Sequence, residues 1–154
     1  KAIAAIGWRG SEAVVDPDAI VEGTYGGREG DKGRTNKDYF MNRKAQGWWS
    51  LRRRFQKTHR WVTEGVKCPP DEIVAISSKC PNHMKLIAEL SQPTFAPNGV
   101  GKMVINKKPP KTKSPNLADA CMIRFAPKEA PPAEYTQELI QMIRQAGMRR
   151  RRGR

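Results

Sequence analysis

One acidic residue, Asp119, follows a lysine-rich run and has a small residue on each side, Ala118 and Ala120. The run before it, residues 107–113, reads KKPPKTK and contains no acidic residue. Its lysines attract phosphate, and a carboxylate beside them can bind a hard divalent cation such as Mg²⁺ through oxygen. The alternative is an acid that interacts only with a helix dipole, worth about 0.3 to 1 kcal/mol. The lysines of this run, taken as candidate phosphate contacts, are Lys107, Lys108, Lys111 and Lys113.

The residues around Asp119 predict a helix from Pro115 to about Ala126. Ser114 can cap its N-terminus, and Pro115 suits the first helical position because no N–H donor is needed there. An apolar residue then recurs at every fourth position, which marks the face that packs on the core: Leu117, Cys121 and Phe125. Asp119 lies roughly 160 to 200° around the helix from that face, so we expect it to point away from the core.

A second group of cations stands in residues 34–60, which hold nine basic residues and one acidic residue, Asp38. Asn36 can cap a long helix that runs to about Trp61. Asp38 then lies in the first turn, where the helix dipole favours negative charge. Gly65 is expected to end this helix.

This long helix has two faces of different character. The residues expected to face the core are Phe40, Trp48, Leu51 and Phe55. The basic residues on the opposite side are Arg43, Arg53, Arg54 and Lys57. Such a side is either a solvated charged face or a set of phosphate contacts, and the sequence between Tyr39 and Thr63 holds no acid that could pair with it. Both interpretations stay open, and the four residues are candidate nucleic-acid contacts.

The composition points to a single domain that attracts polyanions. The chain has 154 residues and a formal net charge of +14, with 29 Lys and Arg against 15 Asp and Glu. No apolar run approaches the roughly 18 residues of a membrane span, so we expect a soluble intracellular protein without a membrane partner. The three cysteines, Cys68, Cys80 and Cys121, are expected to be reduced thiols, and zinc bound by them with His83 is the alternative.

The remaining segments are expected to form short elements. These are a helix end at 1–6, strands at 13–15 and 73–76, a glycine-rich loop at 22–33, a helix at 82–90, and a hairpin of 94–96 with 102–106 around a two-residue turn. After a proline-rich break, residues 134–146 predict an amphipathic helix followed by an arginine-rich tail.

Two stretches resemble the nuclease domain of phage terminase large subunits. Residues 107–125, KKPPKTKSPNLADACMIRF, look like its closing motif, in which Ser-Pro-Asp-Leu-Ala-Asp-Ala opens the last helix of a ribonuclease H-like fold. Residues 34–65, RTNKDYFMNRKAQGWWSLRRRFQKTHRWVTEG, resemble the segment before it. The resemblance covers about residues 1–126, with one departure: Asn116 stands where the family has its first Asp.

The resemblance implies an α/β fold, an incomplete ribonuclease H-like nuclease domain that lacks its leading strands. Residues 1–128 would be the C-terminal portion of that domain, and 129–154 a helical extension with an arginine-rich tail. The implied activity is a two-metal endonuclease, using Mg²⁺ or Mn²⁺, that cuts concatemeric double-stranded DNA in the cytoplasm of a bacterial host. The family's last-helix carboxylate maps onto Asp119, and its other metal ligands lie on strands upstream of Lys1. The chain alone is expected to be inactive.

The implied partners are double-stranded DNA, an upstream ATPase domain of the same protein, the portal or procapsid, and the small terminase subunit. Two other functions stay open. One is a DNA-binding adaptor without chemistry, and the other is a module that docks the packaging motor through residues 134–146.

Overall fold

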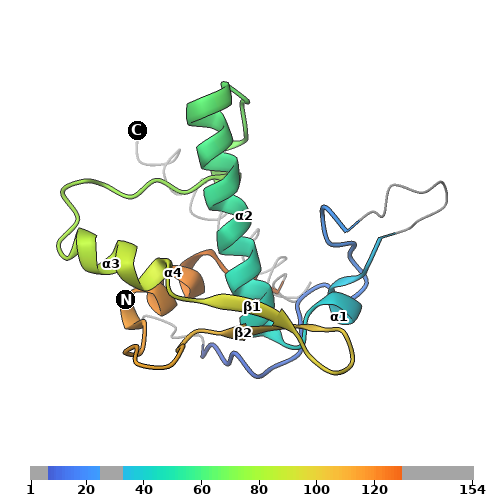
Figure 1. Cartoon of the computed structure of the whole chain (residues 1–154). Helices are drawn as coiled ribbons and strands as arrows, with labels where there is room; N and C mark the ends of the chain where they lie inside the picture. Colours follow the sequence, from blue (N-terminus) through green and yellow to red (C-terminus); the bar gives the residue numbers. More distant parts are fainter. Residues whose placement is uncertain (1–6, 25–32, 130–154) are drawn as a thin grey trace, which may run out of the picture.

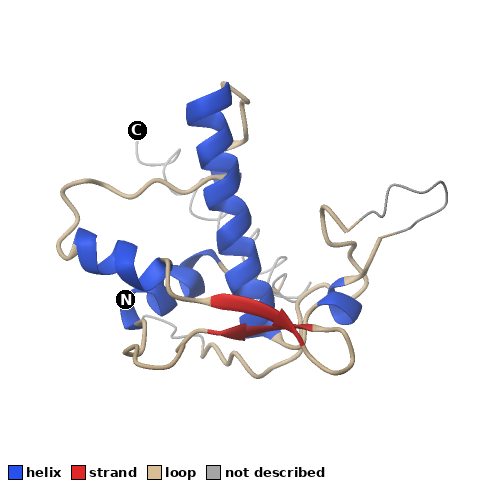
Figure 2. Ribbon diagram, viewed as in Figure 1, coloured by secondary structure: helices blue, strands red, loops and turns tan. Residues whose placement is uncertain are grey.

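The computed structural model describes residues 7–24 and 33–129, which form several helices and one antiparallel pair of strands (Figure 1, Figure 2). The elements are α1 (Asn36–Tyr39), α2 (Arg43–Glu64), a 3-10 turn (Pro70–Glu72), α3 (His83–Leu90), β1 (Thr94–Pro97), β2 (Met103–Asn106) and α4 (Asn116–Phe125). The helices predicted at 1–6 and 134–146 lie outside the described residues, as does most of the glycine-rich loop.

The predicted long helix is two helices, and the sequence placed its start wrongly. The chain is extended at Phe40, which forms an isolated bridge with Met103 of β2. The N-terminus of α2 is capped instead by Asn42, whose side chain accepts a hydrogen bond from the Ala45 N–H at 3.0 Å. Asn36 uses its side-chain amide to donate to the Val15 and Asp16 carbonyls. The predicted end at Gly65 is confirmed, because this glycine takes the left-handed conformation with φ 69°.

The core lies where α2 meets α4 and the sheet. Four residues of the predicted long helix were expected to face the core, and three of them, Phe40, Trp48 and Leu51, are buried. Helix α4 is rotated relative to the prediction, because its fully buried residues are Ala118 and Met122 rather than Leu117 and Cys121. Met122 packs directly over Gly47 of α2, where a Cβ atom would lie 2.6 Å from the Met122 sulfur. A glycine on α2 thus lets the two helices approach closely.

The predicted hairpin is confirmed, but its turn is longer than two residues. Thr94 pairs with Asn106 and Pro97 with Met103, which leaves residues 98–102 as the loop. The Asn98 side chain accepts from the backbone N–H groups of Val100 and Lys102, at 3.1 and 2.9 Å, and so adds to the backbone hydrogen bonds inside the loop.

Two predicted strands, 13–15 and 73–76, are not strands in the structure. A side chain of α2 takes the place of a neighbouring strand in each. The buried Gln46 amide accepts from the Val15 N–H and donates to the Val15 carbonyl, both at 2.8 Å. The Thr58 hydroxyl does the same for Val74, both at 3.0 Å. Segments with apolar, strand-like composition therefore attach to a helix, because its polar side chains satisfy their backbone groups.

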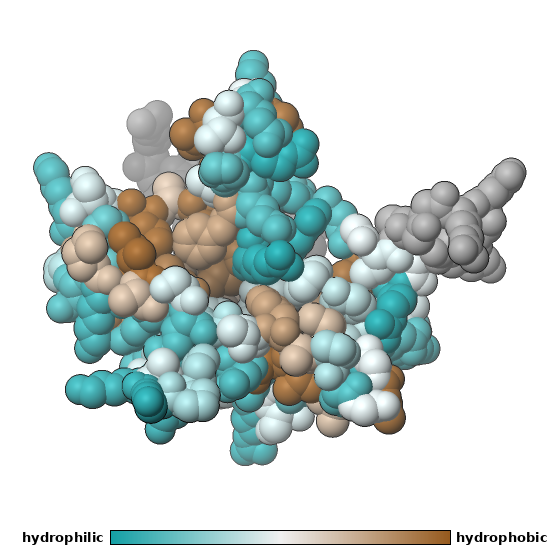
Figure 3. All heavy atoms as spheres, in the orientation of Figure 1, coloured by the Kyte–Doolittle hydropathy of each residue, from teal (hydrophilic) through white to brown (hydrophobic). Residues whose placement is uncertain are grey.

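Apolar side chains also gather between α2 and α3 in the space-filling view (Figure 3). They line a groove of about 790 Å³ whose walls include Trp48, Phe55, Ile87, Leu90 and Phe95. None of the predicted site residues lines this groove.

Candidate functional site

Asp119 and Lys107 form the centre of the candidate site. Lys107 follows the end of β2, and Asp119 lies in the first turn of α4. The Lys107 ammonium donates to an Asp119 carboxylate oxygen and forms an ion pair with it. The Asp119 side chain is 19% exposed, so it is largely enclosed yet still reached by solvent. The sequence placed this acid beside the lysine run, and the structure brings Lys107 into direct contact with it.

The other lysines of the run are directed to solvent. Lys108, Lys111 and Lys113 are exposed, and the salt bridges of the described residues involve none of them. Lys111 has φ 67°, so the loop bends through a left-handed residue. Three ammonium groups of the lysine run are thus exposed and form no salt bridge within the described part of the chain.

The first turn of α4 is not capped as the sequence predicted. Pro115 precedes the helix, and no side chain at the N-cap position accepts a hydrogen bond. The Glu89 carboxylate of α3 does so in place of Ser114: its Oε2 accepts from the N–H groups of Leu117 at 2.7 Å and Ala118 at 3.2 Å. Sequence reasoning missed Glu89, because a cap supplied 28 residues away leaves no local pattern.

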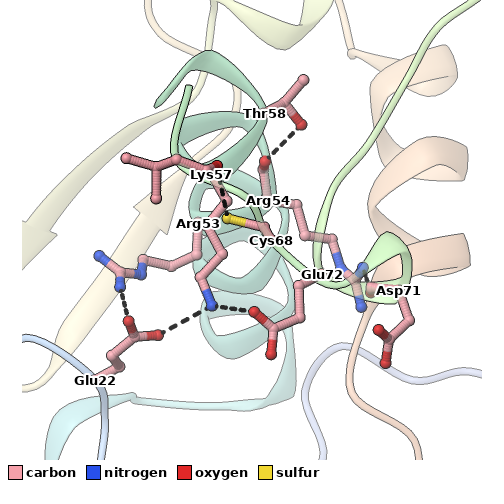
Figure 4. Close-up of polar contacts among 9 residues, drawn as sticks. Glu22, Arg53, Arg54, Lys57, Thr58, Cys68, Asp71 and Glu72 are labelled. Carbon is pink, nitrogen blue, oxygen red and sulfur yellow. Dashed lines mark hydrogen bonds and ion pairs between the residues drawn. The ribbon is translucent and has the colours of Figure 1, made fainter. Parts of the chain in front are cut away.

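The basic residues of α2 that were predicted to contact phosphate are Arg43, Arg53, Arg54 and Lys57, and we call them the α2 basic face. The structure pairs this face with acids from distant segments (Figure 4). Glu22 binds Arg53 at 2.6 Å and Lys57 at 3.5 Å, and Glu72 binds Lys57 at 2.7 Å. The hydrogen bond from Arg53 lowers the pKa of Glu22, and the hydrogen bond to Glu72 raises the pKa of Lys57.

The two remaining cations of the face are also engaged. Arg43 pairs with Glu12 at 2.8 Å and with Glu129 at 3.4 Å. Arg54 donates to the Asp71 carbonyl and lies over the Phe125 ring, 5.3 Å from its centroid. Residues 39–63 contain no acid, as noted from the sequence, but the face is paired because the acids come from outside that range. A phosphate that binds here must compete with carboxylates already in place, so DNA contact by these four residues stays a prediction.

The two groups of predicted site residues form separate surfaces. A cavity of about 330 Å³ is lined by Glu22, Arg53, Arg54, Lys57 and Glu72, among others, and Asp119 is not part of its lining. Three residues of the α2 basic face, Arg53, Arg54 and Lys57, line this cavity, whereas Arg43 and the lysine run do not.

Asp119 can supply one oxygen ligand of a divalent-metal site. In residues 7–24 and 33–129 no three His, Cys, Asp or Glu side chains are grouped to hold a metal ion. The three cysteines are free thiols, and burial raises the pKa of Cys121. Among the described residues, Asp119 therefore has no pair of further carboxylate, imidazole or thiol ligands grouped with it.

The fold matches part of a ribonuclease H-like terminase nuclease domain, as comparison with solved structures shows. The chain is similar to the nuclease domain of the large terminase subunit gp2 of bacterial virus Sf6, with a TM-score of 0.66 and 30% identity over 79% of this chain and 52% of that one. It matches lysine-to-alanine variants of that domain equally well, one with manganese and beta-thujaplicinol at 0.66 and one with calcium at 0.65.

These matches confirm the resemblance to terminase large-subunit nuclease domains and the partial ribonuclease H-like fold. The chain spans about half the length of the domains that it matches. No protein-family model matches it, and no curated protein sequence does. Among the described helices, none has the length and apolar composition that a bilayer crossing needs.

Proposed function

We propose that this chain is part of a phage DNA-packaging terminase large subunit and contributes to a metal-dependent endonuclease that cuts concatemeric double-stranded DNA. The observation that carries the proposal is the enclosed Asp119–Lys107 pair at the first turn of α4, in a fold shared with terminase nuclease domains. Manganese and calcium in structures of the matched domain support a divalent cofactor, which we propose to be Mg²⁺ or Mn²⁺.

Asp119 is the residue that would bind metal and take part in catalysis. Two divalent ions, when bound, supply an activated water and stabilise the charge of an in-line displacement at phosphorus. The Lys107 ammonium donates to the Asp119 carboxylate and holds it in one orientation. Lys107 is 34% exposed, so the same ammonium can turn toward a phosphate when a cation takes its place beside the carboxylate.

DNA backbone contacts are proposed on two surfaces. Lys108, Lys111 and Lys113 are exposed on the loop that leads from Lys107 to α4, and we propose that they bind phosphates near the cleaved bond. The α2 basic face would bind phosphates farther away, by exchanging its carboxylate partners for the DNA backbone. Contacts of this kind fix the position of the duplex and read no sequence.

The partners of the whole protein are proposals of the same kind. They are an upstream ATPase domain of the same protein, the small terminase subunit, and the portal or procapsid, with residues 129–154 as the attachment segment in the host cytoplasm. This chain alone would be inactive, because the described residues provide one carboxylate of the site.

The experiment that tests this function is nicking of supercoiled plasmid in Mn²⁺ by the protein with its complete nuclease domain. Asp119→Ala should lower the cleavage rate by roughly a hundredfold or more and leave ATP hydrolysis unchanged, because one metal ligand is lost. Asp18→Ala is the control, since Asp18 is an exposed acid paired with Lys37. Nicking by Asp119→Ala at the wild-type rate, with DNA binding intact, would favour the non-catalytic DNA-binding module instead.

A further inference from the structure

Two side chains at and just beyond the C-terminal end of α3 form hydrogen bonds with the segment that runs from Lys107 to the start of α4. Glu89 lies in the last turn of α3, and Gln92 lies two residues beyond the end of that helix. Helix α3 packs against α4, as Figure 1 shows. We call Glu89 and Gln92 the α3 clamp.

Gln92 ties together the two ends of the lysine run. Its side-chain amide nitrogen donates to the Lys107 carbonyl at 2.6 Å and to the Lys113 carbonyl at 2.9 Å. An amide NH₂ group has two hydrogens, so this single group is fully used in closing the loop. The backbone of Lys107 is thereby fixed at the point where its side chain leaves toward Asp119.

Glu89 fixes the backbone next to Asp119, the ion-pair partner of Lys107. Its carboxylate accepts from the N–H groups of Leu117 and Ala118, which α4 itself cannot satisfy at its first turn. Ala118 directly precedes Asp119. An anion at a helix N-terminus is stabilised both by these donors and by the helix dipole. The Glu89 side chain is only 12% exposed, and its other oxygen lies 4.0 Å from the well-exposed Lys85 ammonium.

We propose that Glu89 and Gln92 are positioning residues that set the placement of Lys107 relative to Asp119, a proposal that rests on the metal-binding role of Asp119. Lys107 and Asp119 are twelve residues apart and belong to different elements, so their meeting depends on the loop between them. That loop contains Lys111 in a left-handed conformation and has few backbone hydrogen bonds of its own. The α3 clamp supplies four hydrogen bonds from the C-terminal end of α3 and the residues just after it. They hold both ends of the loop between Lys107 and α4.

Amide hydrogen exchange tests the clamp without relying on cleavage. Glu89→Ala should speed exchange at Leu117 and Ala118 by about tenfold or more, because their acceptor is lost. Glu89→Gln retains a carbonyl acceptor and should show a smaller change. The matched control is Lys85→Ala, which removes the distant ion-pair partner of Glu89 and should leave these amides as in the wild type. Unchanged exchange at Leu117 and Ala118 in Glu89→Ala would overturn the proposal.

The dependence of plasmid nicking on Mn²⁺ tests the consequence for the site, again in the protein with its complete nuclease domain. Outer residues that orient metal ligands typically contribute 10–100-fold in metal affinity. Glu89→Ala and Gln92→Ala should therefore raise the half-saturating Mn²⁺ concentration by about tenfold, with cleavage largely recovered at saturating metal. Glu89→Gln keeps an acceptor and should lie closer to the wild type, and Gln92→Ala carries the test if Glu89→Ala fails to fold. An unchanged Mn²⁺ dependence in Gln92→Ala, or in a folded Glu89→Ala, would overturn the positioning role.

The two proposals can fail separately. If Asp119→Ala cleaves normally, the proposed function fails, and hydrogen exchange still decides whether Glu89 holds α4. If Asp119→Ala is inactive while folded clamp variants keep the wild-type Mn²⁺ dependence, the proposed function stands and the positioning role is wrong.

Discussion

The acidic partners of Arg53 and Lys57 come from distant parts of the chain. Their partner Glu22 lies about thirty residues before them, and Glu72 lies on the segment that follows α2. Neither acid lies within α2, so the sequence of the helix alone does not indicate these ion pairs. Glu89 was missed for the same reason, because it reaches the start of α4 from 28 residues away, whereas the placement of Asp119 near the start of a helix followed from the residues next to it in the sequence.

The Glu22 network predicts a stability that depends on pH. Because Arg53 lowers the pKa of Glu22 below the ordinary carboxyl value of 4.5, this group stabilises the fold above that value. The contribution is lost as the pH falls through the lowered pKa. Glu22→Gln should therefore lower the melting temperature at pH 6, and the difference from the wild type should shrink as the pH falls below 4.5 through the lowered pKa of Glu22. The effect is small because Glu22 is 64% exposed, and Glu64→Gln, which alters an exposed pair within α2, is the control.

At the scale of elements, the sequence predicted what depends on short-range pattern. The end of α2 at Gly65, helix α3, the hairpin and α4 were found in this way. The break at residues 40–42 was missed, because it follows from the bridge between Phe40 and Met103 rather than from local propensity. The strands expected at 13–15 and 73–76 failed because Gln46 and Thr58 replace a neighbouring strand.

The close approach of α2 and α4 gives a prediction about packing. Gly47→Val should destabilise the protein by about 2 kcal/mol, because the added methyl groups meet Met122 and Ala126 in a filled interface. Gly99→Val is the matched control, since nothing lies within 4 Å of a Cβ atom at that loop position. Equal denaturant midpoints for the two variants would show that α2 and α4 can move apart without loss of stability.

At the scale of the whole molecule, the positive charge predicts salt-sensitive DNA binding. If the α2 basic face and the lysine run contact about five phosphates, the logarithm of the association constant should fall with the logarithm of salt concentration with a slope of about −4 to −5. Replacing Lys111 and Lys113 by alanine should make the slope shallower by about 2, whereas Arg60→Ala, outside both groups, should change it less. A flat response between about 50 and 200 mM salt would exclude phosphate contact as the source of affinity.

If Asp119 binds the catalytic metal, as we propose, anomalous diffraction from Mn²⁺ should locate the ion beside its carboxylate. Crystals of the protein with its complete nuclease domain would be soaked in Mn²⁺ and measured at the manganese absorption edge. We expect an anomalous peak about 2 to 2.6 Å from an Asp119 carboxylate oxygen, with the Lys107 ammonium moved away from that carboxylate. Manganese bound elsewhere in the domain, with the Asp119–Lys107 ion pair unchanged, would contradict it.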